Sequence, residues 1–329
     1  MTAARSGSEV RLCRPVTLAR RLLWVDGPAR SGKTTLCRMV GSLADCEIER
    51  IEEIVDYVGF LYSFGKISHD AAVALLRMFP DIFLYNSLLA RNINFRWGDA
   101  SSGLRSAKPF LYLRRLFRGE HQEALAREGA DRAIFQNHTH FQLERIGIHF
   151  DAHPEGLSVI EVLRHPADLV HAWWIKGRGG DLCSSPWNVA MCGTVDGQCV
   201  HHLAFGWEAE YAAMAPADRI VRMLHGAQMR ARQAYRALPG ERRRKVMVVK
   251  FEDLAGDPHG IIAAVAQFIG TRPTRATRRT ISKMGLPWLE ASSAHERNLA
   301  ELAPQLGNES RRRLDEMIAD YRTGWDGGA

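Results

Sequence analysis

Short apolar runs alternate with amphipathic stretches along most of the chain. The runs that are short and rich in branched or aromatic residues predict strands at residues 22–25, 133–135, 157–163 and 245–251. The amphipathic stretches predict helices at residues 34–44, 69–78, 112–128, 167–175, 217–238, 259–269, 274–284 and 310–321. This alternation is typical of βαβ units, so we expect an α/β fold with a central, mostly parallel sheet flanked by helices.

Residues 177–204 interrupt this alternation. They are rich in Gly, Cys and Ser and predict a long loop, a kind of segment that usually has a function. No internal repeat or low-complexity linker divides the chain. We therefore expect an N-terminal extension over residues 1–20 and a single domain over residues 21–329.

The composition is that of an ordinary globular protein. Of the 329 residues, 46% are hydrophobic and 25% are charged, which excludes a disordered, collagen-like or coiled-coil chain. No apolar run approaches the roughly 20 residues of a membrane span. Arginines interrupt the apolar residues near the N-terminus, so we expect no secretory signal. The expected location is the cytoplasm, without a membrane span.

The charge of the chain is basic. Its 44 Lys and Arg exceed its 37 Asp and Glu, which gives a net charge of +7 and suits a polyanionic ligand. Runs of arginine lie at residues 242–245, 275–279 and 311–313. Because no aromatic residues interleave with these runs, we expect no nucleic-acid partner. The sequence does not indicate an oligomeric state.

The cysteines form no recognisable metal or disulfide pattern. Cys183, Cys192 and Cys199 lie near His201 and His202, but their spacings match no usual zinc site. We therefore expect free thiols, no disulfide framework and no bound metal.

The most specific motif is a phosphate loop. Residues 27–34 fit G-x-x-x-x-G-K-[ST] and lie between a predicted strand and a predicted helix. Its glycines let backbone N–H groups and the helix N-terminus surround an anion. Lys33 adds a positive charge, and the hydroxyls of Ser31, Thr34 and Thr35 add donors. The motif predicts a three-layer P-loop NTPase-like fold that binds a nucleotide.

The phosphate loop leaves the chemistry open. An ATP- and Mg²⁺-dependent small-molecule kinase also needs a carboxylate at the end of another strand. Glu252 and Asp253, after the last predicted strand, are the candidates for that role. This kinase is the alternative function, and a nucleotide-binding protein without chemistry is a further one.

Three segments, in this order, resemble the sulfotransferases that use 3′-phosphoadenosine-5′-phosphosulfate (PAPS). Residues 29–34, A-R-S-G-K-T, are similar to that family's P-[KR]-S-G-T-T loop. Residues 159–171 resemble its strand–R-x-P–helix element, and residues 248–258 resemble its late strand with E-D-L and a following D-P. The resemblance implies in-line transfer of a sulfuryl group from PAPS to a hydroxyl or amine of a small-molecule, glycan or lipid acceptor. The product nucleotide would be 3′-phosphoadenosine-5′-phosphate (PAP), and no metal is expected.

The resemblance also implies which residues hold PAPS. Arg164 would pair with the 3′-phosphate, His171 stands where the family has a serine, and Arg297 lies in a late segment that lacks the family's glycines. Arg30 and Lys33 would stabilise the leaving oxygen. The implied cofactor contacts are Arg30, Ser31, Gly32, Lys33, Thr34, Thr35, Arg164, His171 and Arg297.

Sulfuryl transfer also needs a general base to take the proton of the acceptor. Residues 133–138 resemble the family strand that ends in K-T-H, which makes His138 the leading candidate and His140 the second. Glu52 and Glu53 are further candidates, because some branches of the family use a glutamate. The insertions at about residues 47–130 and 177–240 would form the acceptor side, but no motif there identifies the acceptor.

Overall fold

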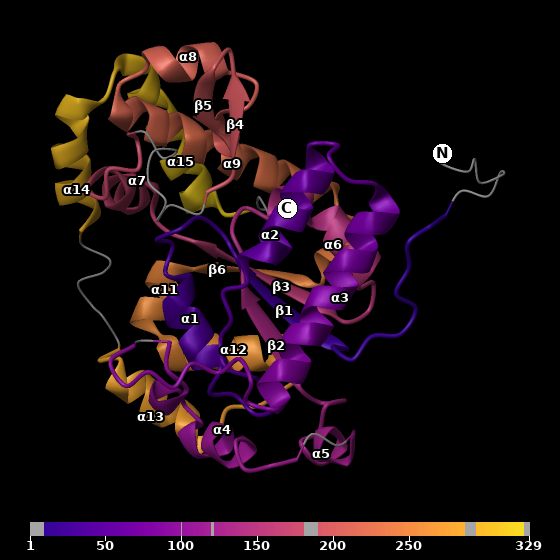
Figure 1. Cartoon of the computed structure of the whole chain (residues 1–329). Coiled ribbons are helices and arrows are strands. Elements are labelled where there is room, and N and C mark those ends of the chain that lie inside the picture. The colour runs from indigo at the N-terminus through magenta and orange to yellow at the C-terminus, as the bar shows by residue number, and fades with distance from the viewer. Residues whose placement is uncertain (1–9, 100, 120–121, 181–189, 287–293, 326–329) are drawn as a thin grey trace, which may run out of the picture.

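A four-stranded parallel sheet forms the centre of the molecule (Figure 1). The computed structural model describes residues 10–99, 101–119, 122–180, 190–286 and 294–325. The strands are β1 (Arg21–Asp26), β2 (Ile134–His138), β3 (Leu157–Leu163) and β6 (Val246–Lys250), in the order β2-β1-β3-β6. All three neighbouring pairs are parallel. The predicted α/β class and the predicted strands are confirmed.

Helices cover both faces of this sheet (Figure 1). In the described part of the chain they are α1 (Lys33–Val40), α2 (Glu53–Ser63), α3 (His69–Leu88), α4 (Pro109–Arg115), α5 (Gln122–Arg127), α6 (Ile146–Ala152), α7 (Pro166–Trp174), α8 (Glu208–Ala213), α9 (Pro216–Ala237), α10 (Gly240–Arg243), α11 (Phe251–Gly256), α12 (Pro258–Phe268), α13 (Arg275–Lys283), α14 (His295–Leu302) and α15 (Asn308–Thr323). Because successive strand residues point to opposite faces, Leu22 and Trp24 of β1 pack towards α2, α3 and α6. Leu23 and Val25 pack towards α1 and α12.

The predicted elements between the first two strands need correction. The helix expected at residues 69–78 is the longer α3, which continues through Pro80. The helix expected at residues 112–128 is divided into α4 and α5. Gly119, between α4 and α5, explains part of the division, because glycine favours the end of a helix.

The long loop expected at residues 177–204 contains a hairpin. Strand β4 (Cys192–Val195) pairs antiparallel with β5 (Gln198–His201). The turn between them is Asp196-Gly197, and both residues have positive φ, 51° and 78°. An Asp-Gly pair between two short strands is a strong signal of a hairpin. The Gly- and Cys-rich composition of the segment had instead favoured a loop. Residues 181–189 lie outside the described part.

The prediction of free thiols is wrong for Cys199, which is disulfide-bonded. Cys13, Cys37 and Cys46 carry free thiols, as expected. Cys183 lies outside the described residues. A disulfide depends on which cysteines the fold brings together, and the spacing along the chain does not contain that information.

Helix α3 is mostly apolar, with Asp70, Arg77 and Asp81 as its charged residues. It is the one described helix that is long and apolar enough to cross a membrane, by length and composition alone. Its charged residues interrupt the apolar run, and core helices of soluble proteins pass the same test. Here α3 packs against α2 and α6.

Residues 10–19 form a strap along α3. The buried carboxylate of Asp81 accepts hydrogen bonds from the backbone N–H groups of Leu18 and Ala19, both at 2.8 Å. Arg14 Nε donates to the same carboxylate at 2.7 Å, and Asp70 accepts from Leu12 N at 2.7 Å. These bonds hold the N-terminal strap, as we name residues 10–19, against the helix.

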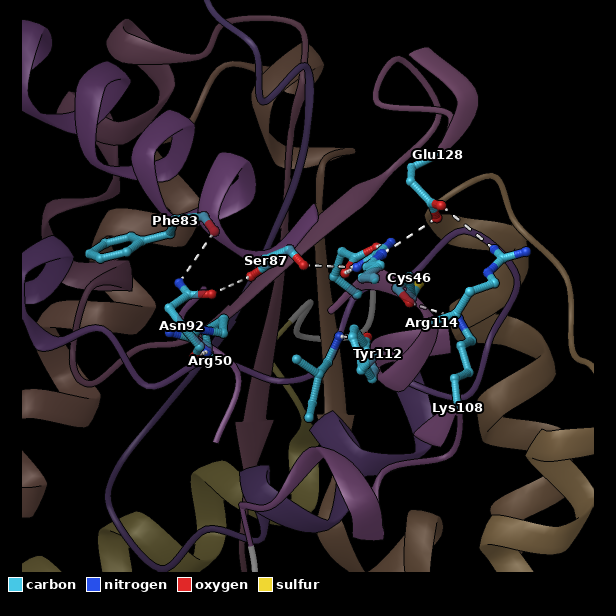
Figure 2. Close-up of polar contacts among 12 residues, drawn as sticks. Cys46, Arg50, Phe83, Ser87, Asn92, Lys108, Tyr112, Arg114 and Glu128 are labelled. Atoms are coloured by element: carbon cyan, nitrogen blue, oxygen red, sulfur yellow. Dashed lines mark hydrogen bonds and ion pairs between the residues drawn. The ribbon is translucent and has the colours of Figure 1, made fainter. Parts of the chain in front are cut away.

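A buried polar network attaches the insertion around α4 to the edge of the sheet (Figure 2). Arg115 donates to both carboxylate oxygens of Glu47, at 2.7 and 2.8 Å, and to the carbonyl of Ser87 at 3.1 Å. Lys108 Nζ donates to the carbonyl of Cys46 at 2.7 Å. Tyr112 Oη accepts from Ile48 N at 2.7 Å. The insertion is therefore fixed to the segment between α1 and α2.

Candidate functional site

The phosphate loop joins the end of β1 to the start of α1, as the sequence predicts. Gly27 and Gly32 have φ of 127° and 97°, values that side chains other than glycine rarely adopt. A Cβ at Gly27 would lie 2.7 Å from the carbonyl oxygen of Val162, and one at Gly32 would collide with the ring of Phe251. Arg30 also has a positive φ, 73°. Both glycines are thus required by the shape of the loop.

The polar side chains of the loop divide into buried and exposed ones. Ser31 is fully buried, and its Oγ has no hydrogen-bond partner among the described residues. The side chains of Arg30 and Thr34 are exposed, and that of Thr35 is half-buried. An unpartnered buried hydroxyl is costly, and a bound phosphate oxygen would satisfy it.

Lys33 is buried and points back into the loop. Its Nζ donates to the carbonyl of Gly27, and the residue is 2% exposed. Burial lowers the pKa of Lys33 to about 8, although the carboxyls of Asp26, Asp56 and Glu161 act in the opposite direction. Lys33 is therefore only partly charged above pH 8.

These three carboxyl groups are buried around Lys33, and our sequence analysis missed them. Burial raises the pKa of each, and mutual repulsion with Asp26 adds to the rise for Asp56 and Glu161. Asp26 accepts from Thr139 Oγ1 at 2.9 Å and from Leu143 N at 2.7 Å. Glu161 had a signal in the sequence, because it is a charged residue inside the apolar run of β3.

Arg164 follows β3 and reaches the phosphate loop. Its Nη1 donates to the carbonyl of Arg30 at 2.8 Å, and its guanidinium lies 5.3 Å from the ring centre of Phe251. Its Nε is buried and has no partner in the described part of the chain. The structure thus places the phosphate loop and Arg164, the two anion-binding elements that the sequence predicted, in contact with each other. Each carries a donor without a partner among the described residues, Ser31 Oγ and Arg164 Nε.

His171 and Arg297 have other surroundings in the described part of the chain. His171 Nε2 lies 2.8 Å from Glu301 Oε2 of α14, so this histidine pairs with a carboxylate. Arg297 is exposed on α14. Their assignment to the nucleotide stays a prediction.

The two histidine candidates for the base lie side by side at the end of β2, with His138 as its last residue and His140 two residues later. The rings of His138 and His140 are stacked, with centres 4.9 Å apart. Burial and the nearby charge of Lys33 lower the pKa of His138 to about 2, and its Nε2 has no partner among the described residues. The same causes lower the pKa of His140. His140 Nδ1 and Asp56 Oδ2 are 3.1 Å apart, so a carboxyl group orients this ring.

The two glutamate candidates differ in their surroundings. Glu52, just before α2, is paired with Arg50 Nη2 at 2.6 Å. Glu53 lines the pocket described next. Glu53 therefore lies nearer to the space where an acceptor could bind.

A pocket of about 200 Å³ opens beside His140. It is lined by Ala29, Glu53, Asp56, Tyr57, Phe60, His140, Phe141, Trp173, Arg178, Ala190, Met191, His201 and His202. Trp173 Nε1 donates to the carbonyl of Ala29 at 2.7 Å, which ties the phosphate loop to this pocket. Arg178 lies 5.3 Å above the ring of Trp173, and burial together with the charge of Arg30 lowers its pKa. Residues from both expected insertions line the pocket, and no sequence motif had pointed to Arg178.

Glu252, one of the two candidate magnesium ligands of the kinase alternative, has other partners. It accepts from the backbone N–H of His165 at 3.0 Å and from Tyr321 Oη at 2.5 Å. It therefore holds the turn that carries Arg164 against α15.

Comparison with known proteins gives likenesses of fold only. No family model matches the chain, and no curated protein sequence matches it. The sulfotransferase domain of the olefin synthase from Synechococcus PCC 7002 has a TM-score of 0.43 and 14% identity, over 83% of this chain and 81% of that one. The sulfotransferase domain from the curacin biosynthetic pathway has a TM-score of 0.44 and 10% identity, over 79% and 77%.

A further solved structure is sulfotransferase STF1 from Mycobacterium tuberculosis H37Rv, with a TM-score of 0.41 and 12% identity over 85% of this chain and 77% of that one. TM-scores and identities this low support no argument about activity. In the order of its motifs, the chain resembles the PAPS-dependent sulfotransferases.

Proposed function

We propose that the protein is a sulfotransferase that moves the sulfuryl group of PAPS to a hydroxyl or amine. The observation that supports this best is the contact of Arg164 with the carbonyl of Arg30, which joins a second cationic site to the phosphate loop. A donor with a 5′-phosphosulfate and a 3′-phosphate needs two neighbouring anion sites. The unpartnered Ser31 Oγ and Arg164 Nε supply donors, one on each element.

In the proposed reaction, the acceptor oxygen or nitrogen attacks sulfur in line and the bond from sulfur to the bridging oxygen breaks. The 5′-phosphate of PAP leaves with the electron pair of that bond, and Lys33 and Arg30 stabilise its charge. The acceptor proton passes to the general base. Thr34, Thr35 and Gly32 contribute donors of the loop and of the N-terminus of α1.

The base in this proposal is one of the stacked histidines. The resemblance favours His138. The structure gives additional support to His140, because His140 lines the pocket and its ring is oriented by Asp56. Both have a lowered pKa in the nucleotide-free protein. A bound polyanion raises the pKa of nearby histidines and brings them closer to the range in which a base is effective.

The structure does not favour the kinase alternative. Glu252 is committed to His165 and Tyr321. Asp26 and Glu161 lie near Lys33, but their raised pKa values work against the charged form that Mg²⁺ needs.

The acceptor class and the location belong to the proposal as well. The pocket combines aromatic side chains with Arg178, which suits an apolar or sugar-bearing small molecule, glycan or lipid. Cytoplasmic location is proposed from the sequence. The disulfide of Cys199 is unusual for that compartment, so the thiol content of freshly isolated protein is a direct check.

The test is a thermal-shift titration with PAP, ADP and ATP, each with Mg²⁺ and with EDTA. A ligand at about 100 times its Kd stabilises the fold by roughly 2.7 kcal/mol, which gives a visible shift. We expect stabilisation by PAP in both solutions. A shift only with ATP or ADP and Mg²⁺ would overturn the sulfotransferase proposal in favour of the kinase.

A second experiment separates the two histidines. Turnover of PAPS is measured with a panel of hydroxyl and amine acceptors for His138→Ala and His140→Ala, with His69→Ala as the control. His69 is an exposed histidine that also pairs with a carboxylate, at 3.1 Å from Asp151. Loss of turnover with unchanged PAP binding identifies the base, whereas full activity of both variants contradicts a histidine base.

A further inference from the structure

Large apolar side chains are exposed on one side of α4. Phe110 is 83% exposed, Leu116 is 48% exposed and Phe117 is 88% exposed. The bond from Phe117 N to the carbonyl of Arg114, at 3.3 Å, continues the path of the helix beyond its last residue. Phe110 and Phe117 are seven residues apart, about two helical turns, so their rings lie on the same side, away from the buried Tyr112. Exposed apolar side chains that gather in this way mark an interaction surface.

A cavity of about 450 Å³ adjoins these side chains, between the insertion around α4 and helix α13. Figure 1 shows α4 and α13 next to each other at the lower end of the view. Phe110 is part of the lining, and the cationic side chains of the lining are Arg38, Arg105, Arg279 and Lys283. None of the described residues that line it belongs to the phosphate loop or to the pocket beside His140. The cavity is therefore a separate cationic hollow beside exposed aromatic rings.

Most of the cations in this cavity have no acidic partner. Glu49 is the one carboxyl group among the described lining residues, and it is paired with Arg38 at 3.6 Å. Arg105, Arg279 and Lys283 form no ion pair with the described part of the chain. Arg279 and Lys283 are exposed and one turn apart on α13. Three cationic groups are therefore available to an anionic partner.

The positive charge of the chain is concentrated in the two segments that form this cavity. Residues 91–118 contain seven Lys and Arg and one acidic residue, and residues 272–284 contain five Lys and Arg and no acidic residue. Three of the arginines in the first segment are paired with Glu47 or Glu128. The two segments together more than account for the net charge of +7 of the whole chain.

We propose that this face, formed by Phe110, Leu116, Phe117, Arg105, Arg279 and Lys283 and here named the α4–α13 face, binds a membrane surface that contains anionic phospholipids. The cationic cavity receives the phosphate-bearing headgroups, and the exposed rings enter the boundary between headgroups and acyl chains. A combination of exposed apolar side chains with basic ones is what such a boundary requires.

The apolar part of the face favours a lipid surface over a nucleic acid. A nucleic acid would also pair with the cations, but Leu116 offers no ring on which a base could stack. The cations also gather around a hollow, whereas a strand of nucleic acid follows an extended groove. The proposal does not depend on sulfuryl transfer, because no residue of the α4–α13 face takes part in the proposed reaction.

The test is co-sedimentation of the full chain with vesicles of two compositions. One is phosphatidylcholine alone, and the other is phosphatidylcholine with phosphatidylglycerol in a ratio of about 7 to 3. We expect binding to the anionic vesicles, and binding to the neutral vesicles that is weaker by about tenfold or more. Raising NaCl from about 0.1 M to about 0.5 M should weaken the binding to anionic vesicles, because salt screens the charges.

Two double variants test the two parts of the face. Arg279→Glu combined with Lys283→Glu should weaken binding to anionic vesicles by at least about 25-fold, because each basic residue near such a surface contributes about fivefold. Phe110→Ser combined with Phe117→Ser should weaken it by at least about tenfold, because two rings no longer leave water. All four side chains are exposed, so these variants are expected to fold, and circular dichroism checks this.

Each double variant has a matched control. Arg243→Glu combined with Arg244→Glu changes the net charge by the same amount, at two exposed residues at the end of α10. Val16→Ser removes an apolar side chain that is 74% exposed on the N-terminal strap. Both controls should bind the anionic vesicles within about threefold of the parent. Losses as large as those of the α4–α13 variants would show that only total charge or total apolar surface matters, and would overturn the proposal.

Four further results would also overturn it. The first is a parent chain that does not bind anionic vesicles, and the second is unchanged binding in both folded double variants of the face. The third is tighter binding to a DNA duplex than to vesicles, lost in the same variants, which would assign the face to nucleic acid. The fourth is a dimer in analytical ultracentrifugation that Phe110→Ser with Phe117→Ser dissociates, which would assign the face to a second copy of the chain. These measurements involve no turnover, so they stand or fail separately from the proposed function.

Discussion

The lowered pKa of Lys33 predicts that nucleotide binding weakens at high pH. Lys33 is buried beside the phosphate loop, and burial brings its pKa to about 8 in the nucleotide-free protein. An anionic nucleotide favours the charged amine, so the bound protein holds this proton to a higher pH. Affinity for PAP is therefore greatest below pH 8 and falls above it.

The size of the effect follows from the ionisation of one group. Above pH 8 the charged fraction of Lys33 falls about tenfold per pH unit, so Kd rises by up to the same factor. Between pH 7 and pH 9.5 the loss of affinity approaches about 30-fold. Isothermal titration calorimetry with PAP at several pH values, in two buffers of different ionisation enthalpy, measures both the affinity and the proton uptake.

Two variants decide whether Lys33 is the cause. Lys33→Met should bind PAP more weakly at pH 7 and lose the pH dependence above pH 8. Lys108→Met is the matched control, because burial also lowers the pKa of Lys108 but its Nζ bonds to Leu43 and Cys46, within the network around α4. A parent protein with pH-independent affinity, or the same slope in Lys33→Met, would refute the reasoning.

The unliganded protein should respond to pH in the opposite direction. Between pH 8 and the unfolded value near 10.5, the unfolded chain binds more protons at Lys33 than the folded chain does. The contribution of Lys33 to stability therefore rises with pH over this range. Urea unfolding of the parent and of Lys33→Met should converge as the pH approaches 10.

Other substitutions test the loop and the framework. Arg164→Lys removes the fork that can pair with two phosphate oxygens, so PAP affinity should fall at least about tenfold while ADP affinity changes little; equal losses in calorimetry would contradict a 3′-phosphate contact. Gly32→Ala forces a side chain into positive φ against Phe251 and should cost about 1–3 kcal/mol in urea unfolding, and an unchanged midpoint would count against the loop geometry. Arg115→Met leaves Glu47 buried without its partner and should cost about 3–5 kcal/mol, with partial recovery when Glu47→Gln is added.

Local patterns predicted the sheet and the loop well. Both faces of the sheet are covered, so the central strands are mostly apolar runs, and such runs are visible in the sequence. The phosphate loop has fixed glycine positions, and the structure requires glycine at two of them, Gly27 and Gly32. The hairpin after residue 191 was missed although its Asp196-Gly197 turn was a readable signal.

The arrangement of the site depended on contacts between distant parts of the chain. Asp56 meets His140 across 84 residues, and nothing near either residue indicates the other. Arg178 and Asp26 have no motif of their own, and only the fold places them beside the pocket and Lys33. The pairing of His171 with Glu301 likewise spans 130 residues. The sequence of the helix that carries His171 therefore could not show that this histidine contacts α14.

The N-terminal strap bears on how the protein should be produced. A domain boundary drawn at residue 21 would remove the donors Arg14, Leu18 and Ala19 from Asp81, and it would uncover the apolar face of α3. A chain shortened there would expose more apolar surface of α3 and leave the Asp81 carboxylate without these donors. Such a shortened protein would aggregate or be recovered with detergent. That behaviour would result from the missing N-terminal strap and would not indicate the cellular location of the intact chain.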